Sequence, residues 1–342
     1  MPKHYYQLLI VAFFACLIVP ASYFLYLSQQ TTQEESVFTD TRYQFITVNH
    51  PIQPIPTQLE IDKDWVIVGK ALFHSPLLSK DNSVSCASCH QVDYGGDDGF
   101  SVSTGVDSHQ GLRNSPTVLN AVFNFRQFWD GSVSTLAEQV NGPIHNPVEM
   151  GTNWSQVLIK INADSYFSEA FLQLGITDIN ANDIGKAITV YEESLITPNA
   201  PIDRYLLGNE TALNARQIRG LDKFVSFGCV TCHQGRNIGG NIFQRLGRID
   251  ETPITLQDDL GRYIVTKQEY DKFVFKVPSL RNIADTAPYF HNGSVNSLEE
   301  AVMIMAEVQL GRKLSQDDVT DLVALLQGFS APTLDLLKHA NQ

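Results

Sequence analysis

Cysteine is scarce in this chain, which has five cysteines in 342 residues. Four of them form two Cys-x-x-Cys pairs, and the fifth, Cys16, lies in an apolar stretch near the N-terminus. A Cys-x-x-Cys pair alone would fit a thiol redox centre or half of a zinc site. Here a histidine follows each pair directly, and the two complete motifs use every cysteine outside the apolar stretch. This count argues against both of those readings.

The two motifs indicate covalent haem attachment instead. Thiols at this spacing form thioethers to the vinyl groups of a porphyrin, and the adjacent imidazole ligates the iron from one face. The sequence therefore predicts two c-type haems, one in each half of an exported chain, because attachment of such haems requires export. The predicted attachment residues are Cys86, Cys89 and His90 in the first half and Cys229, Cys232 and His233 in the second.

Positive charge is also scarce, since 24 lysines and arginines stand against 37 aspartates and glutamates. The phosphates of a nucleic acid would repel a chain with a formal charge of −13, so we expect no nucleic-acid partner. An acidic protein suits a basic partner, such as a small electron carrier. Charged residues make up 18% of the chain and aromatic residues 10%, which is typical of a packed globular protein.

The N-terminal segment has no charged residue between Lys3 and Glu34. Residues 8–27 form an apolar run of 20 residues, about one bilayer thickness as a helix. Lys3 before this run favours a cytoplasmic N-terminus and export of the rest. The length favours an uncleaved anchor, but Val19-Pro-Ala21 resembles the cleavage site of a signal peptide, so both readings stay open. We expect residues 1–30 to be a membrane anchor or signal segment, with the haem domains in the periplasm and tethered to the inner membrane.

Strand signals are almost absent from the rest of the chain, and amphipathic helical patterns recur. We predict helices from near Glu60 toward the first motif and then around residues 134–141, 154–161, 180–196, 212–227 and 317–329. Residues 31–56 contain three prolines and read as an irregular tether, and Pro198 and Pro201 mark a junction. The expected fold class is mostly α, with cytochrome c-like haem domains at residues 57–199 and 200–342.

The two halves also repeat one sequence pattern. Residues 129–140 (WDGSVSTLAEQV) and 291–302 (HNGSVNSLEEAV) share Gly, Ser, Val, Leu, Glu and Val at a constant offset. An Arg-Asn pair precedes each segment, at residues 113–114 and 281–282. We infer an internal duplication, in which two haem domains follow one plan.

The same register distinguishes the two haems. In the second half it reaches Met305, on a predicted helix after a loop, where a thioether can ligate the iron from the other face. A His/Met pair raises the reduction potential and suits electron transfer. At the matching place in the first half stands Pro143, which has no donor atom. The alternative for Met305 is a helix-core residue, with Met303 as its neighbour.

A candidate catalytic group lies in residues 138–150, which contain Gln139, His145 and Glu149. Cleavage of the O–O bond of a peroxide needs a group that takes a proton from one oxygen and delivers it to the other. A carboxylate in an apolar pocket can do this, so Glu149 is the candidate acid/base at the open haem. The alternative for Glu149 is a surface or capping residue.

With these residues the chain resembles the bacterial di-haem cytochrome c peroxidases over about residues 57–340. The matching runs are RNSPTVLNA (113–121), QFWDG (127–131), EQVNGP (138–143), PVEM (147–150) and TAPYFHNG (286–293). The resemblance implies two cytochrome c-like domains that reduce hydrogen peroxide to two waters with electrons from a small donor. The donor is expected to be a cytochrome c or a cupredoxin, with a quinol as a further option, and a homodimer is expected from the family.

The resemblance also implies residue roles at the first haem. His90 is the proximal ligand of the peroxidatic haem, and Glu149 is the acid/base with Gln139 beside it. Trp129 lies between the haems as the bridge for electrons. At the second haem, the resemblance makes His233 the proximal ligand.

Further roles follow from the resemblance in the second half and between the domains. Met305 is the second ligand of the electron-accepting haem. Asn114 and the backbone carbonyls of Thr286 and Pro288 match the family's calcium site, and oxygen donors of this kind suit calcium.

One departure from the family lies in the loop at residues 105–112. Many members carry a histidine there that closes the peroxidatic haem until the other haem is reduced, and here Val106 takes that position. His109, three residues on, is the alternative iron ligand, and a solvated loop histidine is its other reading. We expect the first haem to be open in the oxidised state.

Two other functions fit part of the pattern. The MauG-like enzymes of the same superfamily oxidise protein tryptophans and use a tyrosine as the sixth ligand of the second haem, so Met305 argues against that activity. A di-haem electron carrier without catalysis would explain both haem motifs and the acidic charge. It would not explain Gln139, Glu149 or the missing methionine of the first half.

Overall fold

The computed structural model describes residues 50–333. The predicted anchor or signal segment, residues 1–30, and residues 31–49 of the predicted tether lie outside the described residues. Within residues 50–333 no helix is both long and apolar enough to cross a membrane. Residues 51–333 pack as one compact unit, which is mostly helical, as the sequence predicts.

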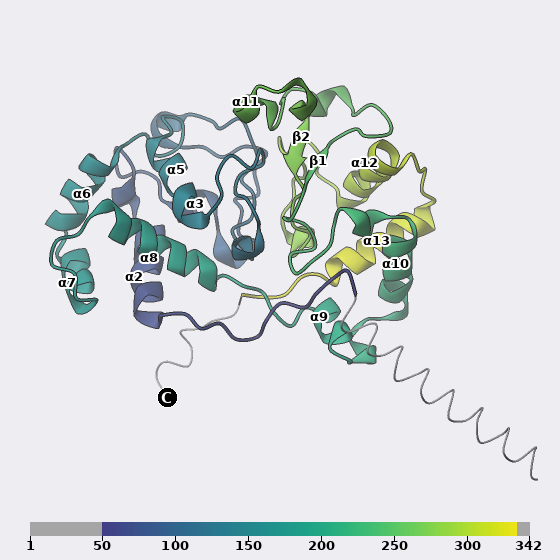
Figure 1. Ribbon diagram of the computed structural model, residues 1–342, viewed down its shortest axis with the longest axis horizontal. Coiled ribbons are helices and arrows are strands. Elements are labelled where there is room, and N and C mark those ends of the chain that lie inside the picture. The colour runs from purple at the N-terminus through teal and green to yellow at the C-terminus, as the bar shows by residue number, and fades with distance from the viewer. Residues whose placement is uncertain (1–49, 334–342) are drawn as a thin grey trace, which may run out of the picture. The chain divides into compact units, whose positions relative to one another are not determined.

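The first half consists of helices joined by long loops (Figure 1). Its helices are α2 (Lys63–His74), α3 (Cys86–Cys89), α4 (Leu136–Gln139), α5 (Asn141–His145), α6 (Trp154–Ala163), α7 (Ser165–Gln173) and α8 (Ala181–Ser194). The helix predicted around residues 134–141 is broken into α4 and α5. Helix α7 was not predicted, although Asp164 caps its N-terminus by accepting a hydrogen bond from the Phe167 N–H.

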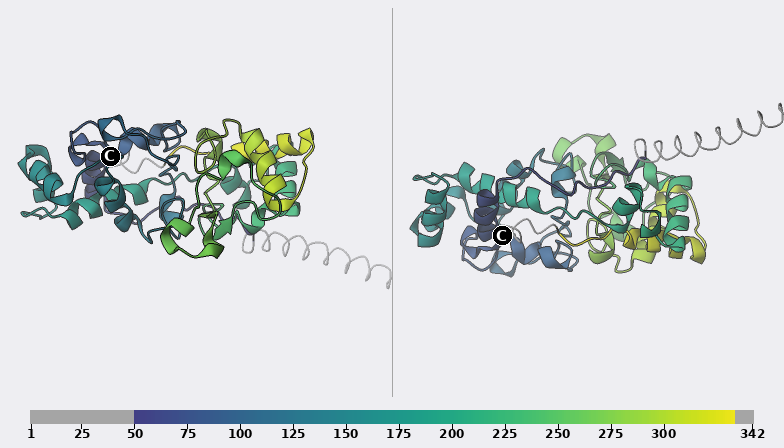
Figure 2. Two further views of the ribbon diagram at one scale, coloured as in Figure 1. Left: turned by 90° about the horizontal axis from the view of Figure 1, so that it is seen from above. Right: turned by 90° about the horizontal axis from the view of Figure 1, so that it is seen from below.

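The second half also consists of helices joined by loops, and it contains the two short strands found in the described region. Its elements are α9 (Pro201–Leu206), α10 (Ala215–Ser226), β1 (Phe243–Arg245), α11 (Tyr263–Thr266), β2 (Val274–Lys276), α12 (Leu298–Leu310) and α13 (Gln316–Gln327). The strands pair antiparallel, with Phe243 opposite Lys276. Figure 2 shows the purple-to-teal elements of the first half and the green-to-yellow elements of the second half in separate groups.

Each half has its own hydrophobic core, built around one close helix pair. The first core runs from Val66 to Leu195 and brings α2 against α8. Gly69 makes this approach possible, because a Cβ at that position would collide with the Ala187 carbonyl oxygen on α8. The second core brings α10 against α13, and a Cβ at Gly220 would collide with the Asp321 carbonyl oxygen. The helix before each haem motif therefore packs through a glycine onto the last helix of its own half.

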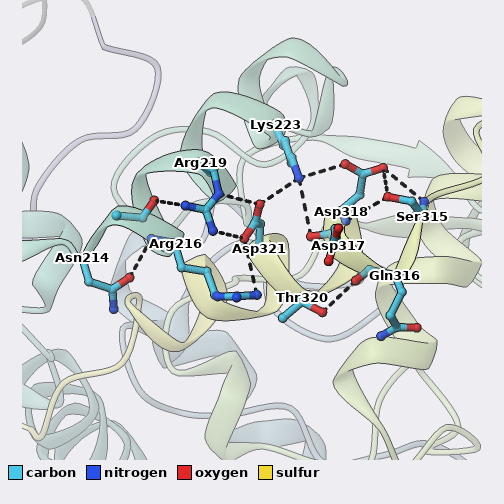
Figure 3. Close-up of polar contacts among 11 residues, drawn as sticks. Asn214, Arg216, Arg219, Lys223, Ser315, Gln316, Asp317, Asp318, Thr320 and Asp321 are labelled. Atoms are coloured by element: carbon cyan, nitrogen blue, oxygen red, sulfur yellow. Dashed lines mark hydrogen bonds and ion pairs between the residues drawn. The ribbon is translucent and has the colours of Figure 1, made fainter.

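The α10–α13 pair is also joined by a network of ion pairs (Figure 3). The Asp321 carboxylate accepts hydrogen bonds from the Arg219 guanidinium at 3.0 and 3.1 Å and from the Lys223 ammonium at 2.8 Å. Lys223 also pairs with Asp318 at 2.9 Å. Arg216 lies 3.7 Å from the same carboxylate. Because Asp321 is only 3% exposed, its charge depends on these three cations.

The prolines in residues 51–56 suggested an irregular tether, but the structure shows that this segment is packed into the protein. The side chains of Ile52 and Ile55 are 1% and 2% exposed, and Ile52 belongs to the core of the second half. The guanidinium of Arg281 donates to the Gln53 carbonyl oxygen at 2.9 Å and pairs with Asp203 at 2.7 Å. This buried ion pair holds the segment to the second half.

The repeated sequence pattern corresponds to repeated backbone geometry. Asn120 and Asn282, which the offset of the repeat relates, both adopt the left-handed conformation, with φ of 62° and 59°. The same offset relates Phe128 to Phe290, with φ of 65° and 69°. It also relates the antiparallel bridge between Gln127 and Val133 to the bridge between Tyr289 and Val295. The Arg-Asn pairs do not share this offset, so Asn120, and not Asn114, is the counterpart of Asn282.

The two equivalent asparagines meet at one residue between the cores. The Thr197 hydroxyl accepts a hydrogen bond from the Asn120 Nδ2 and donates one to the Asn282 Oδ1, both at 2.8 Å. All three side chains are buried, with Thr197 and Asn120 fully so. The connection between the halves is therefore fixed by a small polar network inside the protein.

Candidate haem centres and active site

The first haem motif begins on the short helix α3. The Ser85 N–H donates to the Ser88 hydroxyl at 2.9 Å, which starts the helix, and the His90 N–H donates to the Cys86 carbonyl oxygen at 2.9 Å, which ends it. The His90 Nδ1 lies 3.3 Å from the Gly96 carbonyl oxygen. A proton on Nδ1 for this hydrogen bond leaves Nε2 as the free ligand atom.

The second motif repeats this arrangement. Cys229–Thr231 form a 3-10 turn, and the His233 N–H donates to the Cys229 carbonyl oxygen at 3.0 Å. The His233 Nδ1 lies 3.3 Å from the Ile238 carbonyl oxygen. Burial lowers the pKa of His233 to about 4 and also lowers the pKa of His90, so both rings are held in the neutral form that ligates metals.

The thiols of the two motifs do not have the character of a redox pair. All four are free, and burial raises the pKa of Cys86 to about 12 and that of Cys229 to about 11. Reactive thiols in Cys-x-x-Cys redox centres instead have lowered pKa values. The donor set and its surroundings therefore fit thioether attachment of a haem at both motifs.

A cavity of about 270 Å³ opens at the second motif. Cys229, Cys232 and His233 line it together with Met305, which α12 carries. The structure thus brings Met305 to the predicted haem site, whereas Met303 on the same helix is 44% exposed. These residues would hold a haem between an imidazole and a thioether.

Trp129 lies where the two halves meet and lines the same cavity. Its indole N–H donates to the Asn114 carbonyl oxygen at 2.9 Å, and its own carbonyl oxygen accepts from the Lys276 N–H at 2.8 Å. The ring packs edge to face against His291, with ring centroids 6.4 Å apart. Contacts to both halves therefore fix the orientation of Trp129.

Glu149 lies near the first motif. Its carboxylate contributes to the raised pKa of Cys86 and of Cys89, which places it within electrostatic reach of both thiols. The Asn146 amide donates to the Glu149 Oε1 at 2.7 Å, and burial raises the pKa of Glu149 despite this hydrogen bond. A half-buried carboxylate with a raised pKa suits proton transfer.

Gln139 and His145 are placed differently. Gln139 ends α4 with its side chain half-buried, and no hydrogen bond joins it to Glu149 in the described structure. The His145 ring is exposed, its Nδ1 lies 2.8 Å from the Asn141 carbonyl oxygen, and it packs against Trp154. Sequence reasoning missed Asn146, although an amide three residues before a candidate acid in a turn is a signal for such a contact.

The loop with Val106 lies directly against Glu149. The Val106 N–H donates to the Glu149 carbonyl oxygen at 2.8 Å, and the side chain of Val106 is 1% exposed. His109 is exposed, and its backbone accepts from the Gly105 N–H and donates to the Val106 carbonyl oxygen. The structure thus brings Val106, rather than His109, to the candidate acid/base.

The three predicted calcium ligands also line one cavity. Asn114, Thr286 and Pro288 are all buried there. The Asn114 Nδ2 donates to the Phe100 carbonyl oxygen at 2.9 Å, which leaves its Oδ1 as a potential ligand atom. No cluster of three or more His, Cys, Asp or Glu side chains suited to a metal ion occurs within residues 50–333.

Comparison with known proteins adds the identity of the family. Residues 63–211 match the family model described as di-haem cytochrome c peroxidase. The chain is 44% identical over 286 residues to cytochrome c peroxidase Ccp of Escherichia coli K12, covering 82% of this chain and 61% of that protein's length. A crystal structure of a MauG-like protein associated with microbial copper homeostasis matches with a TM-score of 0.70 at 25% identity, covering 82% of this chain and 94% of that one.

A relative of more similar length gives the same answer. The chain is 41% identical over 290 residues to cytochrome c551 peroxidase of Pseudomonas aeruginosa PAO1, covering 81% of this chain and 84% of that protein. Both named relatives are peroxidases, and peroxidases are oxidoreductases. At this identity and coverage, and with two Cys-x-x-Cys-His motifs in its own sequence, the chain belongs to the di-haem cytochrome c peroxidase family.

Proposed function

We propose that this protein reduces hydrogen peroxide to two waters, taking two electrons from a small donor and two protons from its surroundings. The observation that carries the proposal is the difference between the haem sites. Met305 lines the cavity of His233, whereas the equivalent position of the first half is Pro143, which has no ligand atom. We therefore assign the first site, near which Glu149 lies, to the binding of peroxide.

The haem held by Cys86, Cys89 and His90 would supply the iron that accepts electrons and binds the peroxide oxygen. The remaining chemistry belongs to the chain. The carboxyl group of Glu149 takes a proton from one peroxide oxygen and returns it to the other, so that the departing oxygen leaves as water. Asn146 holds the Glu149 Oε1, which directs the other carboxyl oxygen toward the substrate. We assign Gln139 to the same pocket.

Electron delivery is assigned to the second half. His233 and Met305 would hold the electron-accepting haem, with the high potential that a His/Met pair gives. Trp129 is assigned as the bridge, because its indole N–H and its carbonyl oxygen are held by residues of different halves. The domain division at residues 57–199 and 200–342 is supported by the two separate cores.

We also propose that the first site is open in the oxidised protein. The residue in the gating position, Val106, is buried against the Glu149 backbone and has no ligand atom. His109 lies on the exposed side of this turn, held by two backbone hydrogen bonds. Peroxide would then reach the site without prior reduction of the second haem.

The remaining parts of the proposal concern the electron donor, the location in the cell, the oligomeric state and a calcium ion. The names of the relatives support a small cytochrome c donor, and a cupredoxin of similar potential would serve equally. We assign the protein to the periplasm, tethered to the inner membrane through residues 1–30, and expect a homodimer. Asn114, with the carbonyl oxygens of Thr286 and Pro288, is assigned to calcium.

Glu149→Gln tests the proposed reaction against the alternative of an electron carrier without catalysis. The variant keeps the size and the hydrogen bond from Asn146 but loses the titratable group. Peroxide turnover should fall about 10²- to 10⁴-fold, the usual contribution of a general acid/base, while the spectra of both haems stay unchanged. Glu169→Gln, an exposed glutamate on α7, is the matched control. Unchanged turnover in Glu149→Gln would refute the acid/base assignment.

A further inference from the structure

Lys276 is a buried cation that the proposed mechanism does not use. It lies on β2 between Phe275 and Val277, and it is 7% exposed. Its backbone N–H donates to the Trp129 carbonyl oxygen at 2.8 Å. Lys276 is among the residues that line the cavity of Cys229 and Met305. This buried cation therefore lies at the second haem site.

No partner for this ammonium occurs within residues 50–333: no carboxylate pairs with Lys276, and no hydrogen bond involves its side chain. Burial alone lowers its pKa to about 8, with no neighbouring charge acting on it. An unpaired buried charge is costly, and buried charges in proteins are therefore paired or bound to an ion. Within the described residues, the Lys276 ammonium therefore lacks the anionic partner that a buried charge needs.

A second buried cation shows how the same fold treats such a charge. Arg281 is fully buried, and it pairs with Asp203 at 2.7 Å and donates to two backbone carbonyl oxygens. Arg113, at the contact between the halves, pairs with both Asp130 and Asp259. Lys276 differs from both arginines in facing a ligand cavity. The missing anion is therefore expected to come from the ligand.

The chemistry of the ligand identifies that anion. A c-type haem is attached through its vinyl groups, so its two propionate carboxylates remain free as its anionic groups. We propose that the Lys276 ammonium binds a propionate carboxylate of the haem attached to Cys229 and Cys232, and that this ion pair raises the reduction potential of that haem. The proposal rests on the proposed function only in placing a His/Met haem in this cavity.

The direction of the effect on the potential follows from charge. Reduction of the iron removes one positive charge from the centre, and a nearby buried cation stabilises the reduced form relative to the oxidised form. Burial and second-shell contacts are established levers on haem potentials. Lys276 would therefore act with Met305 in the same direction, as a positioning and tuning residue for electron entry.

The test compares Lys276→Met and Lys276→Gln with the wild-type holoprotein in a spectroscopic redox titration of the second haem. At a fixed potential the ratio of reduced to oxidised haem should fall about tenfold, or about 59 mV for one electron. Lys276→Arg, which keeps the charge, should restore most of the wild-type value. Lys272→Met is the control, since Lys272 has the same formal charge four residues earlier but is solvent-accessible and paired with Glu269.

Two results would overturn the proposal. One is a potential in Lys276→Met and Lys276→Gln equal to that of Lys272→Met. The other needs no variant: in a crystal structure of the wild-type holoprotein, a Lys276 Nζ more than about 4 Å from every propionate oxygen would exclude the ion pair. Neither readout depends on peroxide turnover, so failure of this proposal and failure of the peroxidase assignment are distinguishable.

Discussion

The two halves of the described chain can be compared position by position, because their loops follow one backbone plan at a constant offset. Each half packs the helix before its haem motif through a glycine onto its last helix. Each fixes its proximal histidine through a hydrogen bond between Nδ1 and a backbone carbonyl oxygen. These shared features are the ones that any c-type haem domain needs for packing and attachment.

Two of the differences between the halves fall on residues that we assign to the chemistry. At the offset of the repeat, Met305 of the second half corresponds to Pro143, and His291 corresponds to Trp129. In the proposed function, the first difference would separate a closed, high-potential haem from an open one. The second difference places two different aromatic rings, Trp129 and His291, against each other between the halves. In this proposal, one duplicated scaffold supports two haem environments, and these two positions contribute to the difference between them.

Met305→Ala should have the largest effect, because it removes the ligand that distinguishes the second haem. Without the thioether, the potential should fall by roughly 120 mV, a hundredfold change in the one-electron equilibrium. Turnover with a reduced cytochrome c as donor should fall with it. A redox titration and steady-state kinetics on the holoprotein measure both quantities. Met303→Ala, on the same helix but exposed, is the control, and a wild-type potential in Met305→Ala would contradict the ligand assignment.

Thr197→Val tests the link between the equivalent asparagines. Valine has the same shape but no hydroxyl, so the Asn120 Nδ2 and the Asn282 Oδ1 lose a shared partner inside the protein. A buried polar group without a partner costs about 1–3 kcal/mol, and we expect a loss of about 2 kcal/mol in the free energy of unfolding. Chemical denaturation measures this value. Thr197→Ser keeps the hydroxyl and should stay close to wild type, whereas equal losses in both variants would assign the effect to packing.

Val106→His tests whether the residue at position 106 decides if the first haem is open in the oxidised protein. The wild-type oxidised protein should show one high-spin ferric signal beside one low-spin haem in electron paramagnetic resonance. A histidine at position 106 should close the first haem, convert its signal to low spin and slow the reaction of the oxidised protein with peroxide about tenfold. Val106→Leu controls for disturbance of the loop. Two low-spin haems in the wild type would instead mean that another residue, with His109 as the candidate, closes the site.

Local patterns in the sequence were sufficient for much of this arrangement. The two haem motifs and the long amphipathic helices were predicted from spacing alone. The constant offset then led from the repeated loop to Met305, which the structure places in the cavity of His233. The position of Met305 could be predicted because the chain itself contains a second copy of the element for comparison, whereas its role as a ligand stays a prediction.

Tertiary contacts explain what was missed. The prolines in residues 51–56 suggested a tether, but the segment is held by Arg281, which lies far away in the sequence. The partners of Thr197 are 77 and 85 residues away, and the environment of Lys276 depends on a cavity formed by several elements. A single lysine among apolar residues of a short strand was the available signal for that position.

Asp321→Asn should have the smallest effect on stability. It tests a difference between the α10–α13 pair and the α2–α8 pair. The second pair is joined by the Asp321 carboxylate with Arg219 and Lys223 (Figure 3). In the first pair, the Lys186 ammonium lies 3.7 Å from the centre of the Trp65 ring. Removing the carboxylate charge should lower the free energy of unfolding by about 1 kcal/mol at pH 7, because the cations around it are partly exposed and can be solvated instead.

The pH dependence of stability distinguishes the Asp321 ion pairs from the contact between Lys186 and Trp65 in the first half. Hydrogen bonds from Arg219, then from Lys223, lower the pKa of Asp321 from its ordinary 3.8 to about 2. Its contribution is therefore complete above about pH 4 and is lost as the pH falls through about 2. The difference in stability between wild type and Asp321→Asn should shrink over that window. Lys186→Met should show no such trend, because the contact between an ammonium and an indole involves no group that is protonated in acid.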